Sequence, residues 1–207
     1  MNGDPAALYE LAVRTMDGRG VARDPRAAVA LFEKAGEKNL APAQYRAGNA
    51  YEKGIGVPRD VEAARRWYQR AAENGNTRAM HNLAVLMAEG AGGKPDYAAA
   101  MTWFSKASEH GVRDSQFNLA VLFARGLGTQ QDLVRSYTWF AVAASQGDDE
   151  AGRKRDEVAA RLQPADLARA KAAVERWRMT PPSPTANEVP PAAAKWSSIM
   201  GRRSGRA

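Results

Sequence analysis

The sequence predicts an all-α, right-handed α-solenoid made of four helix-turn-helix repeats and a two-helix C-terminal cap. Three features that recur with a period of 36 residues lead to this prediction: a Gly-x-Gly pair, a following aspartate and an aromatic pair. A fixed period of this size is typical of repeat proteins, in which each unit stacks on its neighbours. The glycine pairs are Gly18/Gly20, Gly54/Gly56, Gly90/Gly92 and Gly126/Gly128. The aspartates are Asp24, Asp60, Asp96 and Asp132.

The repeats are predicted to span residues 5–148, as units 5–40, 41–76, 77–112 and 113–148. The first helix of each unit carries apolar residues at helical spacing, as in Phe117, Ala120, Val121 and Ala124. The Gly-x-Gly pair ends this helix, because glycine adopts the left-handed conformation of a helix C-terminus without steric cost.

The second helix of each unit is predicted to begin at the recurring aspartate, which accepts hydrogen bonds from unpaired backbone N–H groups. Pro25 follows Asp24, and proline is well tolerated in the first helical turn. The helix contains the aromatic pair, for example Trp67-Tyr68, which we expect to pack against a neighbouring repeat. Each unit then closes at Asn39, Gly75, Gly111 or Gly147.

Two further segments and an uncapped first repeat complete the expected organisation. Residues 149–178 form two helices out of register with the repeat, which are predicted to cap the apolar end of the array. Residues 179–207 are rich in proline and basic residues and are predicted to be disordered. The first repeat begins at about Pro5 without a preceding cap, which favours either a chain cut from a longer protein or a gene start placed inside one. The open N-terminal face also predicts self-association as a second hypothesis.

The composition excludes several classes of function. The chain has no cysteine, so it holds no disulfide, cysteine nucleophile or cysteine-based zinc site, and it has only two histidines. It contains no run of 18 apolar residues, and residues 1–20 carry three acidic residues and no apolar block, so neither a membrane span nor a secretory signal is expected. A net charge of +7 is moderately basic and decides nothing alone.

Candidate catalytic and metal-binding residues have simpler interpretations. The glycine pairs follow a helix and lack the third glycine of a dinucleotide-binding loop. His81 takes the register position of Tyr45 and Phe117, which predicts packing, and His110 is expected to be exposed beside a turn. The acidic residues Asp148, Asp149 and Glu150 fit a helix N-terminus. We therefore predict no catalytic, cofactor-binding or metal-binding residue.

The repeat pattern resembles the Sel1-like repeat family, which is similar to tetratricopeptide repeats. The resemblance covers about residues 5–148, and the second unit carries it best, through Gly54, Gly56, Val57, Asp60, Ala63, Ala64, Trp67, Tyr68, Ala71, Ala72 and Gly75. It implies an α-solenoid that binds proteins.

A narrower resemblance concerns the C-terminal region of the PodJ family of alphaproteobacterial polar localisation factors. It is carried by segments 43–45, 51–58, 80–86, 114–119 and 154–159. In that family the region is periplasmic and follows a coiled coil and one membrane span. The resemblance implies a role in polar localisation or envelope organisation, with a periplasmic location for a fragment of such a protein and a cytoplasmic one for a chain complete as given.

The best candidate binding site lies on the first helices, which line the concave face of tetratricopeptide-like solenoids. One register position holds Glu10, Arg46, Asn82 and Asn118, and the position three residues later holds Val13, Asn49, Val85 and Val121. Residues three apart share a helix face, and asparagine amides donate to and accept from a peptide backbone. The predicted partner-binding residues are Glu10, Arg46, Asn49, Asn82 and Asn118.

The predicted function is a non-catalytic scaffold that binds a protein or peptide on this concave face. The alternative is a module that binds peptidoglycan or another anionic polymer through basic residues and the basic tail. No nucleic-acid partner is expected, because acidic residues interrupt the basic ones and the tryptophans are committed to packing.

Overall fold

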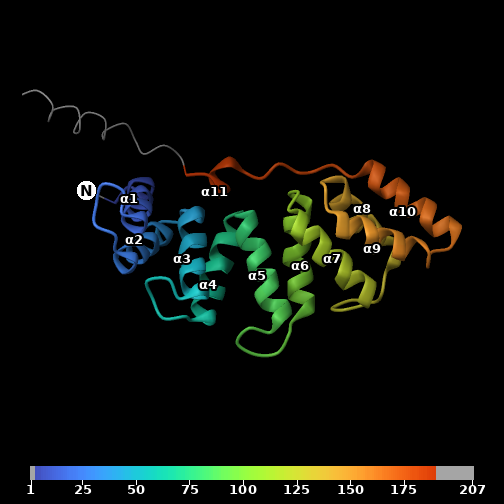
Figure 1. The fold of residues 1–207 in the computed structure, drawn as a ribbon, viewed down its shortest axis with the longest axis horizontal. Helices are drawn as coiled ribbons and strands as arrows, with labels where there is room; N and C mark the ends of the chain where they lie inside the picture. The colour runs from blue at the N-terminus through green and yellow to red at the C-terminus, as the bar shows by residue number, and fades with distance from the viewer. Residues whose placement is uncertain (1–2, 190–207) are drawn as a thin grey trace, which may run out of the picture. The chain divides into compact units, whose positions relative to one another are not determined.

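The computed structural model describes residues 3–189, and this part of the chain is helical and contains no strand (Figure 1). The helices are α1 (Pro5–Asp17), α2 (Pro25–Glu37), α3 (Ala41–Lys53), α4 (Val61–Glu73), α5 (Thr77–Glu89), α6 (Tyr97–Glu109), α7 (Arg113–Arg125), α8 (Leu133–Ser145), α9 (Asp149–Ala159), α10 (Pro164–Arg176) and the short α11 (Pro184–Asn187).

The chain divides into two compact units. From here on, each unit means one of these two groups and not a single repeat. Unit 1 contains the first two repeats (α1–α4) together with α11, and unit 2 contains the last two repeats (α5–α8) together with α9 and α10. In unit 1, α1 pairs with α2 and α3 with α4, and α2 packs against α3. In unit 2, α5 pairs with α6 and α7 with α8, and α6 packs against α7. The predicted all-α fold of stacked helical hairpins is confirmed within each unit.

The recurring aspartates cap the second helices, as the sequence predicts. Asp24 Oδ1 accepts a hydrogen bond from the Ala27 amide at 3.0 Å, and Asp60 Oδ1 accepts one from Ala63 at 2.9 Å. Asp96 and Asp132 make the corresponding bonds at 2.9 Å in unit 2. Each bond satisfies one of the backbone donors that a helix N-terminus leaves unpaired.

The second glycine of a Gly-x-Gly pair has a packing role beyond ending a helix. At Gly56, φ is +74°, and a Cβ atom would overlap the Pro25 carbonyl group. At Gly128, φ is +76°, and a Cβ atom would lie 2.6 Å from the Tyr97 carbonyl carbon. Within each unit, this glycine therefore lets the loop of one repeat lie directly on the helix start of the preceding repeat.

An aromatic contact joins the two helices of every repeat. The ring centroids of Tyr9 and Phe32 lie 5.4 Å apart, and those of Tyr45 and Tyr68 lie 5.8 Å apart. In unit 2 the matching distances are 5.7 Å for His81–Phe104 and 5.3 Å for Phe117–Phe140. His81 thus takes the packing position that its register predicts.

Two buried glutamines, which the sequence analysis did not single out, connect neighbouring repeats. Gln44 is fully buried, its Nε2 donates to the Gly36 carbonyl at 2.9 Å, and its Oε1 accepts from Asn74 Nδ2 at 2.9 Å. In unit 2, Gln116 donates to the Ser108 carbonyl at 3.2 Å and accepts from Gln146 at 2.7 Å. Each glutamine adds a side-chain hydrogen bond to a carbonyl group at the end of the preceding second helix, which also accepts a backbone amide.

Helices α9 and α10 pack against α8 at the end of unit 2. Asp148 caps α9 by accepting from the Ala151 amide at 2.9 Å. Ala151, Val158 and Ala170 are buried in the cluster that contains Phe140. These helices therefore cover apolar surface of the last repeat.

Residues 179–189 depart from the predicted disordered tail, and residues 190–207 lie outside the described part of the chain. In unit 2, the Thr180 amide donates to the Glu109 carbonyl at 2.8 Å, and the Thr180 carbonyl lies 2.8 Å from His110 Nδ1. The composition of this segment, which is rich in proline and basic residues, predicted disorder because composition gives no information on backbone hydrogen bonds of this kind. His110, expected to be exposed, is accordingly half-buried.

Candidate functional site

The predicted first-helix strip forms part of a pocket in unit 1. Val13 on α1 and Arg46 and Asn49 on α3 line one cavity of about 230 Å³, whose floor includes Phe32 and Ala50. A cavity of roughly 150 Å³ holds a benzene ring, so this space accommodates one large side chain. Val13 and Asn49 share a register position and Arg46 lies three residues before Asn49, so the pocket brings together both register positions of the predicted strip.

Charged and aliphatic side chains that the sequence analysis did not predict complete the rim. Arg19 and Ile55 also line the pocket, and each is the middle residue of a Gly-x-Gly pair. The Arg19 amide donates to the Arg14 carbonyl at 2.9 Å, and the Ile55 amide donates to the Ala50 carbonyl at 2.9 Å. These bonds close the helix end tightly and hold the middle residue in place.

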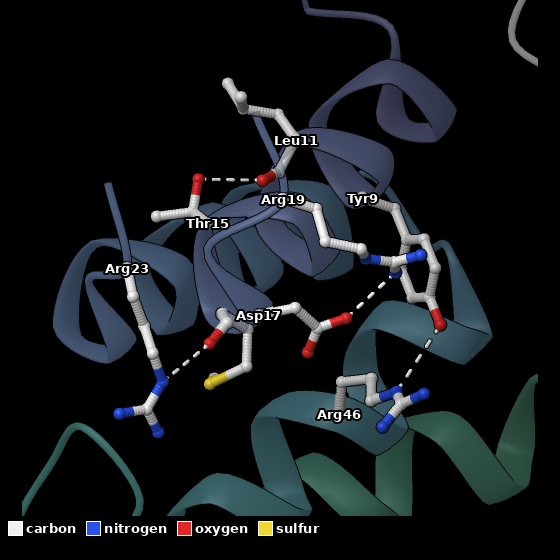
Figure 2. A network of polar contacts seen from close by, with 8 residues as sticks. Tyr9, Leu11, Thr15, Asp17, Arg19, Arg23 and Arg46 are labelled. Atoms are coloured by element: carbon white, nitrogen blue, oxygen red, sulfur yellow. Dashed lines mark hydrogen bonds and ion pairs between the residues drawn. The ribbon is translucent and has the colours of Figure 1, made fainter. Parts of the chain in front are cut away.

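Figure 2 shows the polar groups of this region. Arg19 Nη2 lies 2.8 Å from Asp17 Oδ2, so its charge is paired. Arg46 is exposed, and its Nε donates to the Tyr9 hydroxyl at 3.4 Å. The pocket lining therefore holds two guanidinium groups against one carboxylate, and Arg46 is the cation best placed to meet a negatively charged group.

The remaining predicted residues do not join this pocket. Glu10 lies on α1 with an exposed side chain that pairs with Arg14, one turn away, and it is not among the lining residues. Asn82 and Asn118 lie half-buried on α5 and α7 of unit 2. The five predicted residues thus fall into two groups, one in each unit.

Unit 2 has a pocket of its own, of about 250 Å³. Val121, which takes the register position of Asn49, lines it together with Phe140. Neither Asn82 nor Asn118 lines it. Its other lining residues come from the end of α7 and from the cap helix and the turn after it: Ala124, Arg125, Lys154, Glu157, Val158 and Arg161.

Sequence reasoning missed the middle residues of the Gly-x-Gly pairs, although the signal was present. The flanking glycines repeat, whereas the middle residue varies between Arg19, Ile55, Ala91 and Leu127. A variable side chain held by an invariant loop is typical of a binding surface on a rigid scaffold.

Burial lowers the pKa of His81, partly opposed by Asp114, and its Nδ1 lies 2.8 Å from Ser115 Oγ inside the packed hairpins. Among residues 3–189, no group of three or more His, Asp or Glu side chains is arranged to hold a metal ion. No helix in the described part of the chain is long and apolar enough to cross a membrane.

The fold and the pockets define a helical-repeat protein with a cavity in each unit that first-helix residues help to line. The Sel1 repeat model matches residues 5–40, 41–76, 77–112 and 113–148, which coincide with the four repeats delimited by the sequence period. The match covers more than half of the chain, and the chain therefore belongs to the Sel1 repeat family. Among curated proteins no sequence matches this chain.

Two solved structures have related folds. A Sel1 repeat protein from Oxalobacter formigenes superposes with a TM-score of 0.67 and 27% sequence identity, covering 84% of this chain and 73% of that one. The c5321 protective antigen of uropathogenic Escherichia coli, which has an SLR fold, superposes with a TM-score of 0.50 and 22% identity. That match covers 99% of this chain and 50% of the antigen, and it supports the fold alone.

Proposed function

We propose that this protein is a non-catalytic scaffold that binds a protein partner through the first-helix faces of its repeats. Sel1 repeats commonly mediate protein–protein interaction. The observation that carries the proposal is the unit 1 pocket, in which an apolar floor meets Arg46, Asn49 and the exposed Ile55. Variable side chains on a rigid repeat scaffold are suited to recognition.

The chemistry of this pocket indicates the kind of partner. Its volume of about 230 Å³ fits one apolar side chain, which its floor would desolvate. Arg46 at the rim offers a guanidinium group, which binds carboxylates well. We therefore propose a peptide segment in which an aliphatic or aromatic residue stands next to Asp, Glu or a terminal carboxylate.

A displayed peptide library tests this proposal with the full chain as the target. We expect enrichment of peptides that carry an apolar residue beside an acidic one. Binding of a selected peptide should weaken by about tenfold or more in Arg46→Glu, because a hydrogen bond to a charged group is worth roughly 1.5–3 kcal/mol and the reversed charge adds repulsion.

The matched control is Arg65→Glu, which makes the same charge change at an exposed position on α4 outside the pocket. Equal weakening in both variants would contradict the pocket and favour the anionic-polymer alternative, in which total charge dominates. That alternative also predicts that peptidoglycan binding collapses as salt rises.

The cellular setting that we propose is the bacterial envelope at a cell pole, with the domain in the periplasm. The segments that resemble the PodJ family support this proposal, as in residues 51–58 and 80–86. A fluorescent fusion spread evenly through the cell would contradict it. Self-association through the face of α1 stays a prediction, and sedimentation at increasing concentration tests it.

A further inference from the structure

The C-terminal segment 183–189 belongs to unit 1, although more than a hundred residues separate it from the second repeat. Figure 1 shows its short helix α11 beside α3, and the two helices are in contact. The Asn76 side chain is buried, and its Nδ2 donates to the Ala186 carbonyl at 2.7 Å. The segment is therefore recognised through its main chain.

A steric slot selects the side chain at position 186. Ala186 is 3% exposed and lies against Gly75, where a Cβ atom would come within 3.2 Å of the Ala186 methyl group. Gly75 has a φ of +85°, so it also closes the turn between α4 and the next helix. A side chain larger than alanine would not fit between this turn and the segment.

A second anchor follows three residues later. Val189 packs on an apolar cluster that contains Ala35, Leu40 and Ala43, with Leu8 and Tyr9 at its edge. Between the two anchors, Glu188 is exposed and has extended backbone angles, with its amide bonded to the Pro184 carbonyl at 2.8 Å. Thr185 is also exposed.

The anchors described above are uncharged: the small side chain of Ala186, the aliphatic side chain of Val189 and a hydrogen bond to the Ala186 carbonyl group. Such a segment binds weakly by itself and relies on its attachment to the chain, which supplies a high effective concentration. A tethered occupant of this kind is displaced when a free peptide of the same chemistry reaches a comparable concentration.

We propose that Gly75, Asn76 and the Leu8–Leu40–Ala43 cluster form a peptide-binding groove, of which residues 183–189 are the tethered occupant. The groove takes, from a partner protein, a peptide with Ala or Gly in a single helical turn, followed by extended backbone and an aliphatic residue three positions after the Ala or Gly. This inference concerns residues other than those of the unit 1 pocket, and it stands or falls independently of the function proposed above.

The test uses the full chain and the labelled peptide Pro-Pro-Ser-Pro-Thr-Ala-Asn-Glu-Val, which copies residues 181–189. Ala186→Asp in the protein should release the tether, because a carboxylate does not fit the buried slot against Gly75. Hydrogen exchange of the 183–189 amides should then quicken. The peptide should bind this variant about tenfold more tightly than wild type if the tether occupies the groove roughly nine-tenths of the time.

Thr185→Asp is the matched control, since it adds the same charge at an exposed neighbouring position and should bind the peptide as wild type does. Val189→Asp is a second release variant and should repeat the effect. Equal peptide affinity in wild type, Ala186→Asp and Val189→Asp would overturn the proposal. Equal binding of a peptide that itself carries Asp at the alanine position would also overturn it.

Discussion

The second repeat, in unit 1, and the third repeat, in unit 2, use the same hairpin with different polarity in its aromatic positions. In unit 1, Tyr68 is fully buried and its hydroxyl donates to Glu52 Oε2 at 2.5 Å. In unit 2 the equivalent residue is Phe104, which has no hydroxyl group. The repeat therefore specifies the size of the ring at this position and leaves its polarity open.

The same contrast extends to the groups that titrate. Tyr51 of unit 1 donates to Glu33 Oε1 at 2.7 Å, whereas the equivalent residue of unit 2 is Met87. Tyr45 of unit 1 is replaced in unit 2 by His81. His81 changes its protonation state in the acid range and Tyr51 in the alkaline range. We therefore expect unit 2 to lose stability at low pH and unit 1 to lose stability at high pH.

The largest expected effect concerns the buried glutamines. Gln116→Leu removes the side-chain donor to the Ser108 carbonyl and the acceptor for Gln146, and it should lower the free energy of unfolding by about 1–3 kcal/mol. Gln44→Leu should cost less, because the Gly36 carbonyl also accepts from Arg70 Nη2 at 3.4 Å. Urea unfolding of both variants measures the difference, and an equal loss would show that the second donor contributes nothing.

The next effect is a pH dependence that His81 gives to unit 2. Burial lowers the pKa of His81 below its ordinary value of 6.5. The unfolded chain therefore binds this proton at a higher pH than the native chain, so stability is fully present above pH 6.5 and falls as the pH drops below it.

His81→Phe places in this position the residue that Phe117 supplies in the next repeat, and it should flatten the stability profile on the acid side. Thermal unfolding across this range measures the slope. An unchanged slope in His81→Phe would assign the acid sensitivity to other groups.

The smallest effect is expected in unit 1 at high pH. The hydrogen bond to Glu33, followed by burial, raises the pKa of Tyr51 from 10.0 to about 12. The unfolded chain loses this proton first, so the contribution of Tyr51 to stability is present below pH 10 and is lost as the pH approaches 12.

Tyr51→Phe should remove this alkaline decline and change stability at neutral pH by no more than about 1 kcal/mol, because the bond is only partly buried. Unfolding of the variant beside wild type across the alkaline range measures it. A decline that persists in Tyr51→Phe would point to another phenol.

Much of the fold follows from local patterns in the sequence. The aspartate caps, the left-handed closing residues and the aromatic positions each depend on residues within one repeat, so the 36-residue period reveals them. Part of the site is local in the same sense, since Arg46 and Asn49 lie one turn apart on a single helix.

The sequence by itself thus determined the helical hairpins and their register, and it placed Arg46 and Asn49 on one helix. The tertiary structure decided which loop residues line a pocket with these two residues, why Gln44 and Gln116 are buried, and that residues 183–189 lie on unit 1. These features depend on contacts between segments far apart in the chain. The free energy that stabilises these contacts comes from burying apolar surface and from pairing buried polar groups. Neither contribution can be recognised from the 36-residue period of the sequence.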